Sequence, residues 1–246
     1  MKILVCVSKT PETTAKISFN SENTEFSAAG VTFIMNPYDE WYALVRALEL
    51  AKATNGTVTL ISVGGIDVEP VMRKGLALDA NDGVRIDAQP VSSMFTAFQI
   101  AEYALSQKYD IIFTGKETID YNGSEVGAMI AEYMNVPFIS YATKLEVSGN
   151  TATLERDIEG GAEELEVDLP FVVSAAKGMA EQRIASMMGI MKAKSKPIQV
   201  LAPQPFNNPV HVDRFILPKT KAGVKYIAAD NMDELVRLLH EEAKVI

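Results

Sequence analysis

The chain has 246 residues, and 48% of them are apolar, which is enough for one large domain with a substantial core or for a domain with an appendage. Its formal net charge is −9, which argues against a nucleic-acid-binding protein because affinity for a phosphate backbone needs a basic face. Cys6 is the only cysteine, so a disulfide within the chain and a cysteine-based cluster are excluded, as expected for a reducing compartment.

Metal binding and membrane insertion are also not expected. The only two histidines, His211 and His240, lie far apart in the sequence, which disfavours a histidine-rich metal site. The first apolar run, residues 3–7, follows no basic stretch of the kind that opens a signal peptide. No apolar run approaches membrane-spanning length. These features predict a cytoplasmic protein with no metal, no nucleic-acid partner and no direct insertion into a membrane.

Strand and helix patterns alternate through the first two thirds of the chain. Buried parallel strands are expected at residues 3–7, 58–63 and 111–114, and helices at residues 41–53, 68–78, 95–107 and 124–134. This order predicts a three-layer, Rossmann-like α/β fold with a parallel sheet and helices on both faces. Ligands of such sheets bind beyond the carboxyl ends of the strands, which draws attention to residues 8–14, 64–65 and 115–127.

A helix start is expected after residue 35. Asn36 suits an N-cap, Pro37 suits the first helical position, and Asp39 would complement the helix dipole. A well-capped helix is the simplest interpretation of this segment.

The loop of residues 115–127 is the strongest candidate for an anion site, because the chain contains no dinucleotide-binding glycine fingerprint and no P-loop. Free amides near Gly123, Ser124 and Glu125, together with the helix dipole, would attract an anion. Alternatively, Asn122 or Ser124 is an ordinary N-cap and Glu125 a favourable first-turn acid.

A β-hairpin is predicted from residues 151–156 and 164–168, which alternate in polarity. Gly160 and Gly161 allow a tight reversal between them, and Pro170 opens a short apolar run that reads as a buried strand.

The composition of the chain changes near Lys192. Four prolines between residues 203 and 218 make that stretch too proline-rich for a regular core element. An amphipathic helix is expected at residues 232–243, capped by Asp230 or Asn231. We therefore expect an α/β domain at residues 1–191 and an extended C-terminal arm ending in a helix at residues 192–246, lying on another subunit or on its own domain.

The spacing of residues 154–174 resembles the signature of the β subunit of electron transfer flavoproteins. The positions that carry the resemblance are Arg156, Glu159, Gly160, Gly161, Glu163, Leu165, Pro170 and Ser174. A smaller residue is usual in that family where Leu154 stands. Five other segments agree with it: Lys9 with Pro11, the Met-Asn-Pro-Tyr run from Met35, the Gly-Lys-x-x-Ile-Asp loop from Gly115, and the runs Ile190 to Lys194 and Ala222 to Lys225.

The resemblance implies an electron carrier rather than an enzyme. In that family the β subunit pairs with an α subunit, and the heterodimer carries one redox-active FAD, held mainly by α, and one AMP buried in β. It shuttles electrons from flavin-dependent dehydrogenases to a downstream acceptor, for which a membrane quinone oxidoreductase is one candidate. The fold implied is of the adenine-nucleotide-binding type, and no catalytic residue is expected in this chain.

Matching positions imply a set of cofactor and partner contacts. The residues expected to bind cofactor are Cys6, Asn36, Tyr38, Val63, Asp120, Asn122, Gly123, Ser124, Glu125 and Val126. Tyr38 takes the place of an aromatic residue near the flavin ring, and the others belong to the AMP pocket. Residues 175–188 match the loop that docks onto dehydrogenases, with Met179 in place of its apolar anchor. Met187, Met188 and Met191 are interpreted as core residues.

The nucleotide loop departs from the family pattern. The AMP form usually has Asn-Gln-Thr where this chain has Ser124-Glu125-Val126. A flavin-bifurcating form has Asp-Gly-Asp-Thr-Ala-Gln-Val-Gly here and binds a second FAD in place of AMP. Val126 and Gly127 resemble the bifurcating form, whereas Asn122 and Glu125 match neither form. A bifurcating β subunit and a stand-alone adenine-nucleotide-binding regulatory module are therefore the alternatives.

Overall fold

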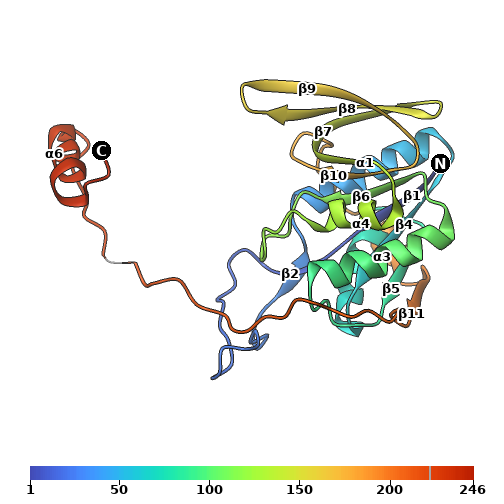
Figure 1. Ribbon diagram of the computed structural model, residues 1–246, viewed down its shortest axis with the longest axis horizontal. Helices are drawn as coiled ribbons and strands as arrows, with labels where there is room; N and C mark the ends of the chain where they lie inside the picture. Colours follow the sequence, from blue (N-terminus) through green and yellow to red (C-terminus); the bar gives the residue numbers. More distant parts are fainter. Residues whose placement is uncertain (222) are drawn as a thin grey trace. The chain divides into compact units, whose positions relative to one another are not determined.

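A nine-stranded sheet organises the larger of the two units into which the chain divides (Figure 1). A computed structural model describes residues 1–221 and 223–246. The larger unit consists of Met1–Ile17 and Ser27–Asp213, and the smaller of Ser18–Phe26 and Arg214–Ile246. Ala222, which begins one of the segments that carry the family resemblance, lies outside the described residues.

The sheet is mostly parallel. Its strands in spatial order are β11 (Ile198–Leu201), β5 (Asp82–Ile86), β4 (Thr57–Val63), β1 (Lys2–Cys6), β6 (Ile111–Gly115), β10 (Phe171–Ala175), β7 (Phe138–Ser148), β8 (Thr151–Ile158) and β9 (Gly161–Asp168). All pairs from β11 to β7 are parallel, and β7, β8 and β9 form antiparallel pairs at one edge. The carboxyl ends of the parallel strands therefore meet at one edge of the molecule.

Helices cover both faces of the sheet, which confirms the predicted three-layer fold. The inward side chains of α1 (Asp39–Ala53) and α2 (Glu69–Leu76) pack with Ile3 and Val5 of β1 in one core cluster. Those of α3 (Ser93–Gln107) and α4 (Val126–Met134) pack with the alternate residues of β1 in a second cluster. Alternating side chains on a strand point to opposite faces, so this central strand contributes to both cores.

The expected hairpin forms, and its family signature has a structural basis. Arg156 of β8 lies opposite Glu163 of β9, and the two side chains form an ion pair. Arg156 Nη1 also donates to Ser140 Oγ at 2.9 Å. The turn differs by one residue from the prediction: Gly161 already pairs with Ile158, so the reversal uses Glu159 and Gly160, whose φ is 86°.

Several short elements were not expected from the sequence. They are the antiparallel pair β2 (Lys9–Pro11) and β3 (Phe33–Met35), the 3-10 turn η1 (Ile66–Val68), α5 (Met187–Ala193), and strands β5, β7 and β11. β11 lies between Pro197 and Pro203, just before the stretch of residues 203–218 that was predicted to be too proline-rich for a regular core element. It fits there because it is an edge strand that ends before Pro203. β5 lacks an apolar pattern because its Arg85 is buried and paired with Glu69 and Asp87.

The smaller unit joins an early loop to the end of the chain. The Phe19 and Phe215 rings stack with centroids 4.6 Å apart, and Phe215 N donates to Asn23 O at 2.7 Å. The final helix, α6 (Met232–Arg237), continues as the π-helical turn η2 (Leu238–Ala243).

The final helix begins at Met232, as predicted, but its capping differs from the prediction. Asn231 occupies the N-cap position, but its side chain makes no capping hydrogen bond. The expected boundary at residue 191 and the docking of the arm on another subunit stay predictions. Among the described residues, no helix is both long and apolar enough to cross a membrane.

Candidate functional site

Three of the predicted cofactor residues gather at the carboxyl edge of the sheet. Cys6 ends β1, Val63 ends β4, and Val126 begins α4; all three belong to or pack against the same apolar cluster. Burial raises the pKa of the Cys6 thiol, and the nearby Glu40 carboxyl adds to this effect. Cys6 therefore contributes a neutral packing surface rather than a reactive thiolate.

Asn36 fixes the loop that follows β6. Its side chain is fully buried, its Nδ2 donates to Glu117 O at 2.8 Å, and its Oδ1 accepts from Ile119 N at 2.9 Å. The expectation that Asn36 is an N-cap was wrong, because α1 begins at Asp39 with Tyr38 in the cap position. Asn36 instead holds two parts of the candidate site together by its amide group.

The loop before α4 is shaped by two residues with left-handed backbone conformation. The φ angles of Asn122 and Ser124 are 50° and 53°. Ser124 Oγ donates to Glu117 Oε2 at 3.0 Å, and Asn122 makes no cap, so neither is the N-cap of α4. Glu125 takes that position without a side-chain capping bond. Asp120, Asn122, Gly123 and Glu125 are all exposed at the surface of this loop.

The amino end of α4 fits a phosphate group. The first amides of a helix have no intrahelical partner and attract anions. Beneath them lies Thr114, whose buried Oγ1 has no hydrogen-bond partner among the described residues. A Cβ on Gly127 would lie 2.8 Å from that oxygen and 2.9 Å from the Phe138 ring, so only glycine allows this approach. The donors present here suit an anionic group such as a phosphate.

Glu40 is a buried acid that the sequence analysis did not identify. Its carboxylate accepts from Ser8 N at 2.7 Å and from Ser8 Oγ at 2.5 Å, and its Cγ fills the place where Gly115 lacks a Cβ. The pKa of Glu40 is raised to about 8, mainly by burial; the Ser8 hydrogen bonds oppose this rise, and the charges of Asp120 and Asp39 add to it. The spacing of Glu40, Leu44 and Ala47 on one helical face was the signal available in the sequence.

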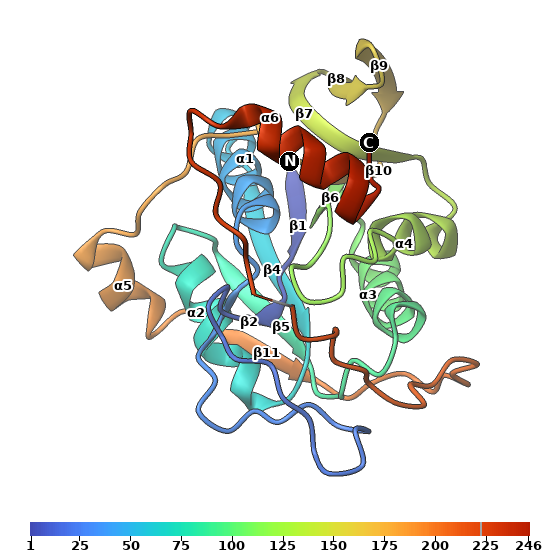
Figure 2. The ribbon, with the colours of Figure 1, turned by 90° about the vertical axis from the view of Figure 1, so that its left-hand side faces the viewer.

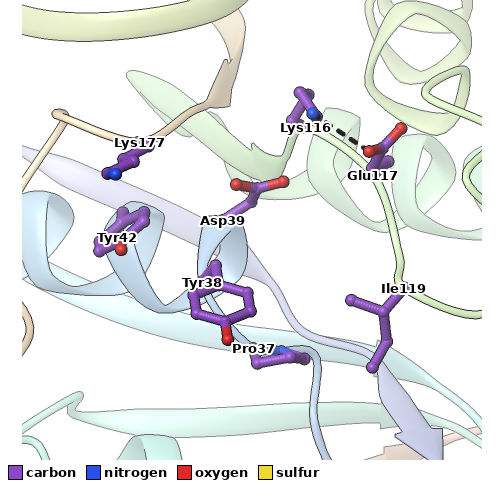
Figure 3. Close-up of a pocket in the computed structure, with 8 residues that line it drawn as sticks. All are labelled: Pro37, Tyr38, Asp39, Tyr42, Lys116, Glu117, Ile119 and Lys177. Carbon is purple, nitrogen blue, oxygen red and sulfur yellow. Dashed lines mark ion pairs between the residues drawn. The ribbon is translucent and has the colours of Figure 1, made fainter. Parts of the chain in front are cut away.

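A cavity of about 370 Å³ opens beside these loops (Figure 3). It is lined by Pro37, Tyr38, Asp39, Tyr42, Lys116, Glu117, Ile119 and Lys177. Tyr38 is 63% exposed and has a φ of 68°, which turns its ring outward from the start of α1. Lys116 pairs with Glu117 at 3.1 Å, and burial raises the pKa of Asp39, which Lys116 partly opposes.

The candidate site thus consists of two neighbouring parts. Of the predicted cofactor residues, only Tyr38 lines the cavity, whereas Cys6, Val63 and Val126 belong to the apolar cluster. Asn36 connects them, because the Glu117 and Ile119 backbone that it holds also lines the cavity. Within residues 1–221 and 223–246, no group of three or more metal-ligating side chains was found.

The methionines near the end of the larger unit are distributed contrary to the prediction. Met187, Met188 and Met191 were interpreted as core residues, yet they are 76%, 66% and 69% exposed. Met179 is only 4% exposed and lies in a core cluster, so its role as a docking anchor stays a prediction that requires its loop to open. The exposed methionines of this segment are those of α5.

Comparisons with known proteins agree with the resemblance seen in the sequence. The family described as "Electron transfer flavoprotein domain" matches residues 24–205. The chain is 34% identical to the electron transfer flavoprotein subunit beta of Bacillus subtilis (strain 168) and 34% identical to the mitochondrial one of Arabidopsis thaliana, with 100% of both chains covered in each case. It is 33% identical to the acryloyl-CoA reductase electron transfer subunit gamma of Anaerotignum propionicum, over 82% of this chain and 77% of that one.

Proposed function

This chain belongs to the electron transfer flavoprotein β-subunit family, and from that membership we propose that it is one half of a two-subunit electron carrier whose redox cofactor is an FAD held mainly by an α subunit. The observation that carries the proposal is the match over the full chain to β subunits that bear this name. FAD supplies the redox chemistry when bound, and the chain positions and shields it.

The cavity at Tyr38 is our candidate for the flavin-facing surface. Its volume of about 370 Å³ and its mixture of aromatic and charged side chains suit the edge of a large planar ring. Lys116 and Lys177 approach it from different loops, which would favour a ring that gains negative charge on reduction (Figure 3). In this arrangement Tyr38 packs on the ring and the lysines influence its potential.

A second nucleotide is proposed for the carboxyl edge of the sheet. Cys6 and Val63 would contact the base, and the α4 amides with Thr114 would receive a phosphate. AMP is the first candidate. A second FAD, as in a bifurcating carrier, is the alternative, and Gly127 at the close approach to Thr114 is the feature shared with that form. Chromatography of nucleotide released by heat from the purified complex separates the two.

Partner contacts are proposed for two further regions. The exposed α5 methionines are our first candidate for the contact with flavin-dependent dehydrogenases, since methionine adapts to several partners. Because one relative is named for acryloyl-CoA reductase, a flavoenzyme that acts on acyl-CoA thioesters is the proposed redox partner. The arm ending in α6, whose Val236 is 56% exposed, is proposed to pack on the α subunit in the cytoplasm.

The proposal is tested by flavin content. The chain is expressed alone and together with an α-like chain, and flavin absorbance is compared after purification. We expect about one FAD per heterodimer and almost none on the isolated chain, because the sequence carries no dinucleotide fingerprint. Stoichiometric FAD on the isolated chain would refute the assignment of the flavin to α.

A stand-alone adenine-nucleotide-binding regulator is the competing function. It uses the same fold and the same carboxyl edge. A complex that holds an adenine nucleotide but no flavin in the presence of α would favour it.

A further inference from the structure

The short helix α5 has one face of small residues and one of large exposed residues. Gly189 and Ala193, four positions apart, are buried, and the helix packs beside α2 (Figure 2). We call the exposed apolar set on α5 and just before it the α5 surface; it consists of Ile184, Met187, Met188 and Met191. These side chains are between 66% and 92% exposed, so they contribute little to the core.

Polar contacts with α2 fix the position of α5. Arg73 Nη1 donates to Ala193 O at 2.7 Å and also to Lys196 O. Lys196 Nζ donates to Leu76 O at 2.9 Å and to Ala80 O at 2.6 Å, at the carboxyl end of α2. Four hydrogen bonds from charged side chains to backbone carbonyls therefore join α5 and the residues after it to α2 and the turn that follows α2.

Backbone contact and a second anchor fix the rest of the segment. A Cβ on Gly189 would overlap the carbonyl oxygen of Ala77, which is backbone and cannot rotate away. Ser186 caps the helix by accepting from Gly189 N at 3.1 Å, and Trp41 Nε1 donates to Arg183 O at 3.1 Å. The α5 surface is thus presented in one orientation before any partner arrives.

The charge around the α5 surface indicates the chemistry of its partner. The chain has 32 acidic residues, yet none lies between Glu181 and Asp213. Arg183, Lys192 and Lys194 are exposed beside the methionines. A basic rim around an apolar centre fits a surface with an apolar hollow and an acidic rim.

We propose that Arg73, Lys196 and Gly189 are positioning residues that hold the α5 surface in a preformed orientation for a dehydrogenase whose docking face is an apolar hollow with an acidic rim. The inference rests on the proposed function and adds to it what sets the affinity for the dehydrogenase. A preformed contact surface lowers the ordering cost of binding, so loss of the orientation weakens docking without altering the flavin.

The test uses the complete complex with its α subunit and a purified acyl-CoA dehydrogenase reduced by its substrate. Gly189→Ala forces α5 away from Ala77 without replacing any methionine of the chain. The matched control is Gly161→Ala, because a Cβ there meets no atom within 4 Å. We expect Gly189→Ala to raise KM for the carrier at least five-fold, with kcat, FAD content and reduction by dithionite unchanged, and the control to match the wild type.

Arg73 supplies an independent test if Gly189→Ala does not fold. Arg73→Ala should raise KM, and Arg73→Lys should restore most of the wild-type value because an ammonium still reaches one carbonyl. Raising the salt concentration should raise the wild-type KM, because the basic rim is screened. Unchanged KM in folded Gly189→Ala and Arg73→Ala would overturn the inference. Failure of the wild-type complex to accept electrons would instead overturn the proposed function.

Discussion

The carboxyl edge of the sheet and the α5 surface are built in opposite ways. At the carboxyl edge, polar side chains such as Asn36 and Glu40 are buried and hold loop backbone by hydrogen bonds. At α5, the polar contacts lie on the side that faces α2, and apolar side chains such as Met187 are exposed on the other side. Substitutions in the first region should therefore change stability and ligand retention, whereas those in the second should change partner affinity alone.

The strongest test of the first half of this comparison is Asn36→Ala. It leaves the part-buried Glu117 O and Ile119 N without their partners, and each lost partner costs about 1–3 kcal/mol. We expect the free energy of unfolding to fall by about 2–5 kcal/mol and the nucleotide content of the complex to fall with it. Urea unfolding followed by circular dichroism measures the first effect. The control is Asn207→Ala, at an exposed position; equal stability of the two variants would contradict the role given to Asn36.

Two methionine variants compare the regions directly. Met179→Ala should lower the free energy of unfolding by about 2–5 kcal/mol because it opens a cavity in the core. Met187→Ala should change stability by less than about 0.5 kcal/mol but raise KM for a dehydrogenase several-fold. Thermal unfolding and steady-state electron transfer separate the two effects. A raised KM in Met179→Ala at unchanged stability would return the docking role to Met179.

Glu40 predicts how stability varies with pH. Its folded pKa of about 8 lies above the ordinary 4.5, so between these values the folded chain binds a proton that the unfolded chain releases. The free energy of unfolding should therefore fall as pH rises from 5 to 8, by up to about 1.4 kcal/mol per pH unit from this group. Glu40→Gln, which stays neutral, should show a flatter profile in urea titrations at each pH. Parallel profiles would show that Glu40 is ionised throughout.

The smallest predicted effect concerns Glu125 at the start of α4. If the loop receives a phosphate, this carboxylate is a like charge near an anion. Glu125→Gln should increase retention of AMP or FAD through purification, while the helix loses only a few tenths of a kcal/mol of dipole interaction. Chromatography measures the amount of nucleotide that each of the two purified proteins releases on heating. Lower occupancy in the variant would mean that the carboxylate itself contacts the ligand.

The sequence predicted those parts of the fold that depend on local pattern. β1, β4, β6 and the four main helices were expected within a few residues, because their apolar periodicity is strong. The sequence did not predict that the Asn36 side chain bonds to the loop after β6, nor that Glu40 is buried. Both depend on loops that are distant in sequence.

The methionines show the same limit. Met179 and Met187 are the same residue type in one segment, yet Met179 is buried in a core cluster and Met187 is exposed, because Gly189 packs against Ala77 and fixes which face of α5 is outward. Nothing in the periodicity of a seven-residue helix identifies the face that meets α2.

Rapid mixing tests the central claim, that this chain works as half of an electron carrier. The heterodimer with its α subunit is mixed with a substrate-reduced acyl-CoA dehydrogenase, and the absorbance of the carrier flavin is followed. We predict that the flavin bleaches at a rate that saturates as the carrier concentration rises. The carrier concentration needed for half-saturation should be lower for the wild type than for Met187→Ala. A heterodimer that binds flavin but stays oxidised in contact with the reduced dehydrogenase would contradict the proposed transfer from this donor class, and one that holds adenine nucleotide without flavin would contradict the electron-carrier account itself.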